Sequence, residues 1–509
     1  MAAIELRSFP FSEQALYSVL ENPHTNRAEI ASRAHARYLF HYLSELHAGS
    51  IISESPYIDG DYLDDFATYY VRCFTPYLNH CKRLHFFVGA FAHENLTKIT
   101  SGALAKEDLG RLQQEYLGFI VARPLPQAVI GRTALKTFDG DKNRRHYPCL
   151  RLYRANLVGI QLSVESLAFQ EQDTVLAACA TVALWTSFQK TADLFGSTAP
   201  SPAVITRASQ AIHLGRSFPS QGLSVLEICT AIRHVGLEPE LFDLQHTPPV
   251  PLVSLLYSYL RFGLPIILVA NVPGGLHAIT LNGYSLRNDP VRTTEIIGDK
   301  PAIPMNGLRI DKFYGHDDQL GPFCRLVVQD APANSPYPIQ FLREGTIAHP
   351  IAVIIPVYNK VRLTFLDVQM WISRIHQVLK ILVRPTSTVE WNIGLLFSND
   401  YKRAVRESEL LSDDLKRAIV MSALPRFVWY CALSVDGRIV VDFIIDATGL
   451  ARSFPVYLIA WRDASLAAAM VKLMNVASLE KTLRGIFSDR FFDFLKSSLR
   501  DGLPVTRIF

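Results

Sequence analysis

The chain is poor in cysteine and has no long hydrophobic run. Its 509 residues include 7 cysteines, an odd number at scattered positions, which is not the pattern of a disulfide framework. No apolar run approaches the ~18 residues of a membrane span. The first residues also lack the basic and apolar segments of a secretory signal. We therefore expect a cytoplasmic protein with no membrane partner.

An excess of charge of one sign is also absent. The 51 lysines and arginines and the 47 aspartates and glutamates leave a net charge of +4, which does not indicate a nucleic-acid partner. The sequence has no Walker-type phosphate loop and no His-Glu-x-x-His motif, so we expect neither a cofactor nor a metal. What the chain does have is 49% hydrophobic residues, enough for large cores.

Three regions differ in their hydrophobic pattern. In residues 1–110 apolar side chains recur at steps of three and four, which predicts a mainly helical part. Residues 111–330 begin with strand-like runs, continue with an apolar helix and end with a hairpin and a further strand. Residues 331–509 mix both patterns after a Pro- and Ser-rich stretch at 330–337. The length and the patterns together predict a multidomain α+β protein.

A cysteine stands where an extended, partly polar segment turns into an apolar helix, in the run QDTVLAACATVALW from Gln172 to Trp185. Backbone N–H groups at a helix start are unpaired and carry partial positive charge. That field stabilises a thiolate, so Cys179 is a candidate nucleophile; the plain alternative is a small buried residue. Gln172, with Gln170 as its competitor, would donate a side-chain N–H to an oxyanion beside the backbone N–H of Cys179.

Two further candidate groups stand at the ends of predicted strands. His277 follows Gly274 and Gly275 and leads an apolar strand; it would accept the thiol proton, or be an ordinary core histidine. Asp317 and Asp318 end a later strand, and either would orient the imidazole, although aspartates are also common at strand exits. Cysteine, histidine and acid in this order are the layout of a thiol hydrolase.

From about residue 169 to residue 323 the chain resembles the papain-like cysteine peptidases, and among them the bacteriocin-processing double-glycine peptidases. The shared pattern is a Gln before a Cys at a helix start, a Gly-Leu-Ser helix opening at 222–224, a Gly-x-Pro strand start at 263–265, a His-Ala strand that ends in Gly-Tyr, and an acid at a strand end. The resemblance implies a central papain-like domain and a protein or peptide substrate. It implies the following roles: nucleophile Cys179, general base His277, orienting acid Asp317 or Asp318, and oxyanion donor Gln172.

Two positions depart from the family pattern, and both concern the oxyanion hole. Ala180 follows the cysteine where the family has glycine, and Asp173 takes the place of the family's glutamine, which stands one residue earlier here. A second hypothesis is therefore a catalytically silent papain-like scaffold that binds a partner protein. A third is a transferase on the same fold, with an amine in place of water as the final acceptor. In each case the flanking regions would recognise a partner protein or substrate.

Overall fold

The computed structural model of the chain describes residues 3–173, 175–211, 218, 220, 222–332, 339–449, 456–500 and 505–507. The chain forms two compact units, each built from several stretches: unit 1 comprises Met1–Gln245, Gly263–Ser285 and Lys312–Pro356, and unit 2 comprises His246–Phe262, Leu286–Asp311 and Val357–Phe509. Several sheets and many helices make this a mixed α+β protein, as predicted. The expected limits at residues 110 and 330 stay predictions, and most of the stretch 330–337 lies outside the described residues.

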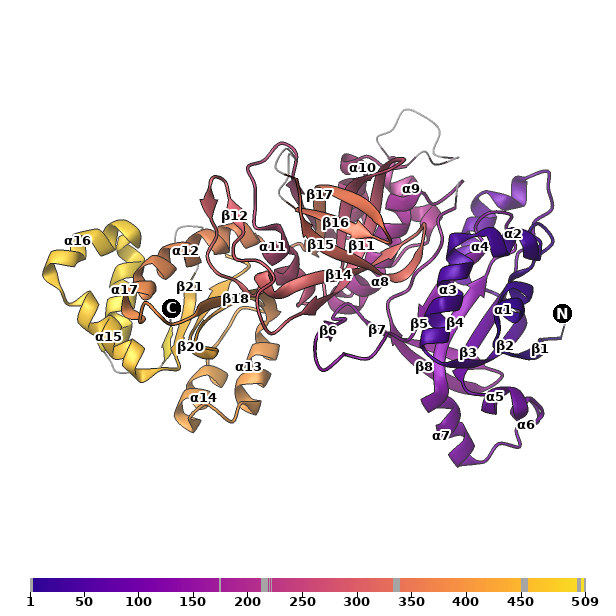
Figure 1. Cartoon of the computed structure of the whole chain (residues 1–509), viewed down its shortest axis with the longest axis horizontal. Coiled ribbons are helices and arrows are strands. Elements are labelled where there is room, and N and C mark those ends of the chain that lie inside the picture. Colours follow the sequence, from indigo (N-terminus) through magenta and orange to yellow (C-terminus); the bar gives the residue numbers. More distant parts are fainter. Residues whose placement is uncertain are drawn as a thin grey trace. The chain divides into compact units, whose positions relative to one another are not determined.

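Unit 1 begins with a five-stranded antiparallel sheet in the order β1-β2-β3-β4-β5. The strands are β1 (Glu5–Pro10), β2 (Ala48–Tyr57), β3 (Cys81–Val88), β4 (Tyr116–Ala122) and β5 (Ile130–Leu135). Helices α1 to α7 lie between these strands along the chain (Figure 1). They are α1 (Glu13–Leu20), α2 (Arg27–Ser32), α3 (Ala34–Glu45), α4 (Gly60–Thr68), the 3-10 helix η1 (Tyr70–Arg72), α5 (Phe91–Glu94), α6 (Leu96–Ser101) and α7 (Lys106–Glu115).

Helices do predominate in residues 1–110, as expected, but the strands β1, β2 and β3 were not predicted. Strand β3 shows the physical reason. Six of its eight residues are buried, on both faces of the sheet, so its sequence lacks the alternation of apolar and polar residues that marks a half-exposed strand. After β5 comes a separate antiparallel pair, which consists of β7 (Arg151–Leu157) and β8 (Ile160–Ser166).

The second sheet of unit 1 is a closed barrel of six antiparallel strands. Its order is β10-β11-β14-β15-β16-β17, and the ring closes because β10 also pairs with β17. The predicted hairpin is confirmed as the antiparallel pair β10–β11. The strands are β10 (Ile266–Val272), β11 (Gly275–Leu286), β14 (Ile310–Asp317), β15 (Gly321–Asp330), β16 (Ile339–Arg343) and β17 (Thr346–Tyr358), with β6 (Arg145–His146) on β11 and β9 (Leu237–Asp243) on β17.

Helix α8 (Cys179–Phe195) packs against this barrel, and it begins at the predicted residue. Its middle is buried on all sides, as the apolar sequence predicted, with Trp185 and Phe188 fully inaccessible. Small side chains allow the close approach of helix and strand, since Ala183 of α8 and Ala278 of β11 belong to one core. The Thr280 hydroxyl of β11 donates a hydrogen bond of 3.0 Å to the Ala183 carbonyl oxygen. The helix and the strand that carry the candidate residues are thus fixed together.

Two shorter helices follow α8 in unit 1, namely α9 (Pro202–Ser209) and α10 (Val225–His234). Helix α10 starts with a capping box: the Ser224 hydroxyl accepts the Glu227 N–H, and the Glu227 carboxylate accepts the Ser224 N–H. This is the arrangement that a Ser followed three residues later by a Glu predicts.

Unit 2 contains a five-stranded antiparallel sheet in the order β18-β19-β20-β21-β22. A two-residue turn of Asp436 and Gly437, both with positive φ, joins β19 to β20, as expected for a tight hairpin. Its strands are β18 (Val389–Phe397), β19 (Phe427–Val435), β20 (Arg438–Asp446), β21 (Val456–Trp461) and β22 (Val505–Arg507), with the short pair β12 (Ile296–Ile297) and β13 (Lys300–Pro301) elsewhere in the unit. Its helices are α11 (Leu252–Leu260), η2 (Asn306–Arg309), α12 (Phe365–Leu382), α13 (Ser398–Glu407), α14 (Asp413–Val420), α15 (Ala464–Met474), α16 (Ala477–Ile486) and α17 (Asp489–Arg500).

Among the described residues, no helix combines the length and the apolar character needed to cross a membrane.

Candidate active site

The candidate nucleophile, Cys179, is the first residue of α8. The residue before it, Ala178, makes no side-chain cap, so no side chain at the N-cap competes for the N–H groups of the first turn. A thiolate at this place would lie in the positive end of the helix field. Of the seven cysteines, all of them free and within the described residues, only Cys179 and Cys73 are partly exposed.

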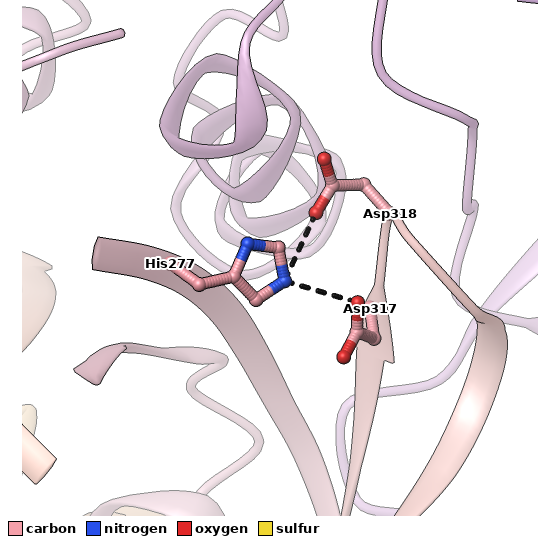
Figure 2. Close-up of side chains that lie close together, drawn as sticks. All are labelled: His277, Asp317 and Asp318. Atoms are coloured by element: carbon pink, nitrogen blue, oxygen red, sulfur yellow. Dashed lines mark hydrogen bonds and ion pairs between the residues drawn. The ribbon is translucent and has the colours of Figure 1, made fainter. Parts of the chain in front are cut away.

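The candidate base, His277, lies near the start of β11 and is almost wholly buried. Figure 2 shows one ring nitrogen facing two carboxylates: Nε2 is 3.0 Å from Asp317 Oδ1 and 3.5 Å from Asp318 Oδ1. The other ring nitrogen faces away from both (Figure 2). Burial lowers the pKa of His277, but the hydrogen bonds with Asp317 and Cys179, together with the nearby negative charges, outweigh burial and raise the pKa to about 10. The imidazole is therefore bonded to a carboxylate and lines the same pocket as the candidate thiol.

Asp317 is the better fixed of the two carboxylates. It lies at the end of β14, accepts the Gln319 N–H at 3.0 Å and forms an ion pair with Arg343 at the end of β16. Burial alone would raise the pKa of Asp317, but the hydrogen bond and charge of His277 and the charge of Arg343 hold it below its usual value. Of the two acids that the sequence left open, Asp317 thus makes the hydrogen bond to the imidazole.

Asp318 lies beside the same ring but in a different environment. Both of its carboxyl oxygens are buried and lack a hydrogen-bond partner among the described residues. Burial, with the neighbouring Asp317 charge, raises the pKa of Asp318 to about 7 against the opposing charge of His277. Its backbone carbonyl oxygen hydrogen-bonds with the ring of His35 from α3. The side chain is therefore poised between its neutral and charged forms near neutral pH.

These three groups also come close enough to hold a metal ion, since one atom from each lies within 4.8 Å of the others. Two observations favour an ion-pair network instead. Arg343 already neutralises Asp317, and Asp317 and Asp318 are only 0% and 2% exposed, which leaves little room for the open coordination position of a catalytic metal.

The buried Asp318 carboxyl leads to a prediction about pH. Between about pH 4 and pH 7 the folded protein keeps a proton on Asp318 that the unfolded chain has lost, so this group's contribution to stability falls as pH rises through that window and stays lost above it. In the variant Asp318→Asn, the side chain at this position cannot ionise. We expect it to raise the free energy of unfolding at pH 8 by about 1–3 kcal/mol and to change it little at pH 4.5.

Urea unfolding at the two pH values measures this effect. Asp64→Asn, at an exposed position of α4, is the control and should change stability by less than about 0.5 kcal/mol at either pH. If Asp318→Asn is less stable than the wild type at pH 8, or if it changes the free energy of unfolding equally at both pH values, then ionisation of Asp318 does not destabilise the folded protein.

Cys179 and His277 line one pocket of about 640 Å³, and Gln172 lies on the same wall. That volume suits a small molecule or a few residues of a peptide. Gln170, the competing glutamine, is 3% exposed and does not line the pocket, so of the two glutamines only Gln172 shares the pocket with the thiol. The remaining lining is mainly apolar and comes from α10, the segment just before it and the barrel, with Leu223, Val225, Ile228, Val269, Leu276 and Ile351 as the larger side chains.

A second histidine, His316, stands directly before Asp317, but its ring nitrogens are already used. Nε2 lies 2.9 Å from the Leu167 carbonyl oxygen, and Nδ1 accepts the Phe323 N–H at 3.0 Å. Burial lowers the pKa of His316 to about 4. It is therefore a structural, neutral histidine, and His277 is the one that faces the pocket.

Two residues of this site have no signal in the sequence. The pairing of β15 with β16 brings Arg343 to Asp317. The hydroxyl of Tyr70 in η1 donates a hydrogen bond to the Asp173 carboxylate. Both contacts join residues far apart in the chain, and neither follows from local periodicity or spacing. Asp173, which departs from the family pattern, is thus held by hydrogen bonds and lies on the pocket wall.

Comparison of this chain with protein-family models, with curated proteins and with solved structures finds no match. The functional argument therefore depends on the residues and their geometry.

Proposed function

We propose that this protein is a cysteine-dependent hydrolase of peptide or amide bonds. One observation carries the proposal: His277 hydrogen-bonds with Asp317 through Nε2 and lines one pocket with the Cys179 thiol, which stands at a helix start. A nucleophile, a base and an acid that orients the base are the parts of a catalytic triad. A helix that begins at the cysteine and packs on a barrel bearing the other two residues also supports the papain-like arrangement expected from the sequence.

The chemistry would run as follows in terms of these residues. The Cys179 thiol gives its proton to His277, and the raised pKa of that imidazole favours the thiolate–imidazolium pair. The thiolate attacks the substrate carbonyl carbon, and the oxyanion accepts hydrogen bonds from Gln172 and from the Cys179 backbone N–H. The imidazolium protonates the leaving amine. Water, activated by the neutral imidazole, then cleaves the thioester and restores the thiol.

Asp317 would keep the imidazole in the tautomer and orientation that this sequence of steps needs. Its own position is set by Arg343 and by the Gln319 N–H. An amine in place of water as the final acceptor would make the same site a transferase. A silent scaffold would instead carry a thiol without activation, and thiol reactivity separates that alternative from the other two.

Alkylation by iodoacetamide tests the proposal without a known substrate. We expect Cys179 to react nearly as fast at pH 6 as at pH 8, whereas an unactivated thiol such as N-acetylcysteine loses about tenfold in rate per pH unit below ~8.5. His277→Ala should slow alkylation of Cys179 at pH 6 by roughly 100-fold, because the imidazole that takes up the thiol proton is then absent. Peptide mass spectrometry of the alkylated protein measures the labelling of Cys179 itself.

His41→Ala, at an exposed position of α3, is the matched control and should react like the wild type. If Cys179 follows the pH profile of the unactivated thiol, or if its reactivity is indifferent to His277, the thiol is not activated and the hydrolase proposal fails in favour of a binding scaffold.

A further inference from the structure

A segment from the first part of the chain, made of α4 and η1, contacts the elements that build the candidate site. We call these residues, 60–72, the support segment. Asp61 Oδ2 accepts the Trp185 indole N–H of α8 at 2.8 Å. Asp65 Oδ1 accepts the backbone N–H of Ala203 in α9 at 3.0 Å. The Tyr70 hydroxyl donates to Asp173 in the loop before Cys179.

The contact of Tyr70 lies nearest to the pocket. Asp173 opens a tight loop that two backbone hydrogen bonds with Ala177 close, of 2.9 and 3.1 Å. One carboxylate oxygen of Asp173 accepts the Val175 N–H at 2.8 Å, within the loop. The other accepts the Tyr70 hydroxyl, which comes from outside it.

Burial makes the contribution of this hydroxyl large. Tyr70 is 5% and Asp173 is 4% exposed, so water does not readily replace a lost partner there. A buried carboxylate oxygen without a donor is costly, and the loop would shift to find one. Gln172 is bonded directly to Asp173 in the chain and lines the pocket with Cys179. A shift of Asp173 therefore moves the side chain that would hold the oxyanion.

We propose that Tyr70 is a positioning residue for the oxyanion hole: by holding Asp173, its hydroxyl sets the place of the Gln172 amide beside Cys179. The inference rests on the proposed function and adds a contribution from a part of the chain that lies outside the papain-like resemblance. It also assigns a role to Asp173, which stands where the papain-like pattern has glutamine: Asp173 links the Tyr70 hydroxyl to the position of Gln172.

Two small electrophiles separate this role from general support of the fold. With 4-nitrophenyl acetate the thiolate attacks the ester carbonyl, the carbonyl electron pair moves to oxygen, and collapse expels 4-nitrophenolate and leaves an S-acetyl thioester. That path passes through an oxyanion. With iodoacetamide the thiolate displaces iodide in one step, and no oxyanion forms. The ratio of the two rates at Cys179 reports the oxyanion hole, and it does not depend on the fraction of protein that is folded.

Tyr70→Phe is expected to lower the acylation-to-alkylation ratio by about tenfold, since it removes only the hydroxyl that holds Asp173. Gln172→Ala is the reference variant and should lower the same ratio by roughly 100-fold, because it removes the side-chain amide that would donate to the oxyanion. Tyr69→Phe, at the neighbouring tyrosine, is the matched control and should keep the wild-type ratio. Asp173→Asn is the second variant, to be used if the phenylalanine variant does not fold, and should give the same selective loss as Tyr70→Phe.

The outcomes separate the two proposals. Absence of acylation at Cys179 in the wild type would overturn the proposed function. Acylation in the wild type with an unchanged ratio in Tyr70→Phe and Asp173→Asn would overturn the role of Tyr70 alone. Equal slowing of both reactions would also overturn it, because the hydroxyl would then act on the thiol or on the fold. A selective loss of acylation supports it.

Discussion

A Cys179→Ser variant is expected to be acylated by 4-nitrophenyl acetate at least roughly 1,000-fold more slowly than the wild type. Serine has nearly the size of cysteine and keeps the start of α8, so the pocket and the helix field are preserved. Its hydroxyl, however, does not ionise near neutral pH, and the imidazole has no thiol to activate. The measurement is the release of 4-nitrophenolate, together with the mass of the peptide that contains residue 179.

Cys73→Ser is the control for this experiment, because Cys73 is the other partly exposed cysteine of the chain. We expect this variant to keep the wild-type rate. If the Cys179→Ser variant releases 4-nitrophenolate at the wild-type rate, the nucleophile is a residue other than Cys179.

Asp317→Ala is expected to lower the free energy of unfolding by about 3–5 kcal/mol, because it removes one partner from a buried ion pair. The Arg343 side chain is only 8% exposed, and His277 would also lose the carboxylate that stabilises its charged form. Amide hydrogen exchange of β11 and β14 in increasing urea measures the change within the barrel itself.

Two further variants make this result specific. Asp400→Ala breaks a pair with Arg403 whose side chains are 45% and 66% exposed, and it should cost less than about 1 kcal/mol. Adding Arg343→Met to Asp317→Ala should recover part of the loss, since the unpaired buried charge is then gone. A loss below about 1 kcal/mol for Asp317→Ala would mean that the buried pair contributes no more than a surface pair.

Local signals in the sequence predicted the parts of the fold that local chemistry determines. The switch from polar to apolar residues placed the start of α8 at Cys179. Ser224 and Glu227 predicted a capping box, and the Pro/Gly turn after residue 270 predicted the hairpin β10–β11. These patterns involve residues within one or two turns of each other, where propensity and hydrogen-bonding geometry decide the outcome.

Other parts depend on partners that are far away in the chain. Closure of the barrel by β10 and β17 leaves no trace in the period of either strand. The strand β3 (CKRLHFFV) buries basic side chains together with apolar ones, so its sequence shows neither a clear strand period nor a clear helix period. The ion pair of Arg343 with Asp317 and the hydrogen bond of Tyr70 with Asp173 join side chains of common types. Nothing in their own neighbourhoods marks them as members of a site.

The closed ring of strands has a consequence for synthesis on the ribosome. The nascent chain presents Cys179 first, then His277 and Asp317, but the ring closes only when β17 (Thr346–Tyr358) pairs with β10. Until β17 has emerged from the exit tunnel, the strands that carry the base and the acid have an open edge beside them. A polypeptide released before that point would contain Cys179, His277 and Asp317 but would lack the closed ring of strands that holds the last two. Under the proposed function, the thiol of Cys179 would therefore meet an aligned base and acid only after β17, the last strand of the ring, has been synthesised.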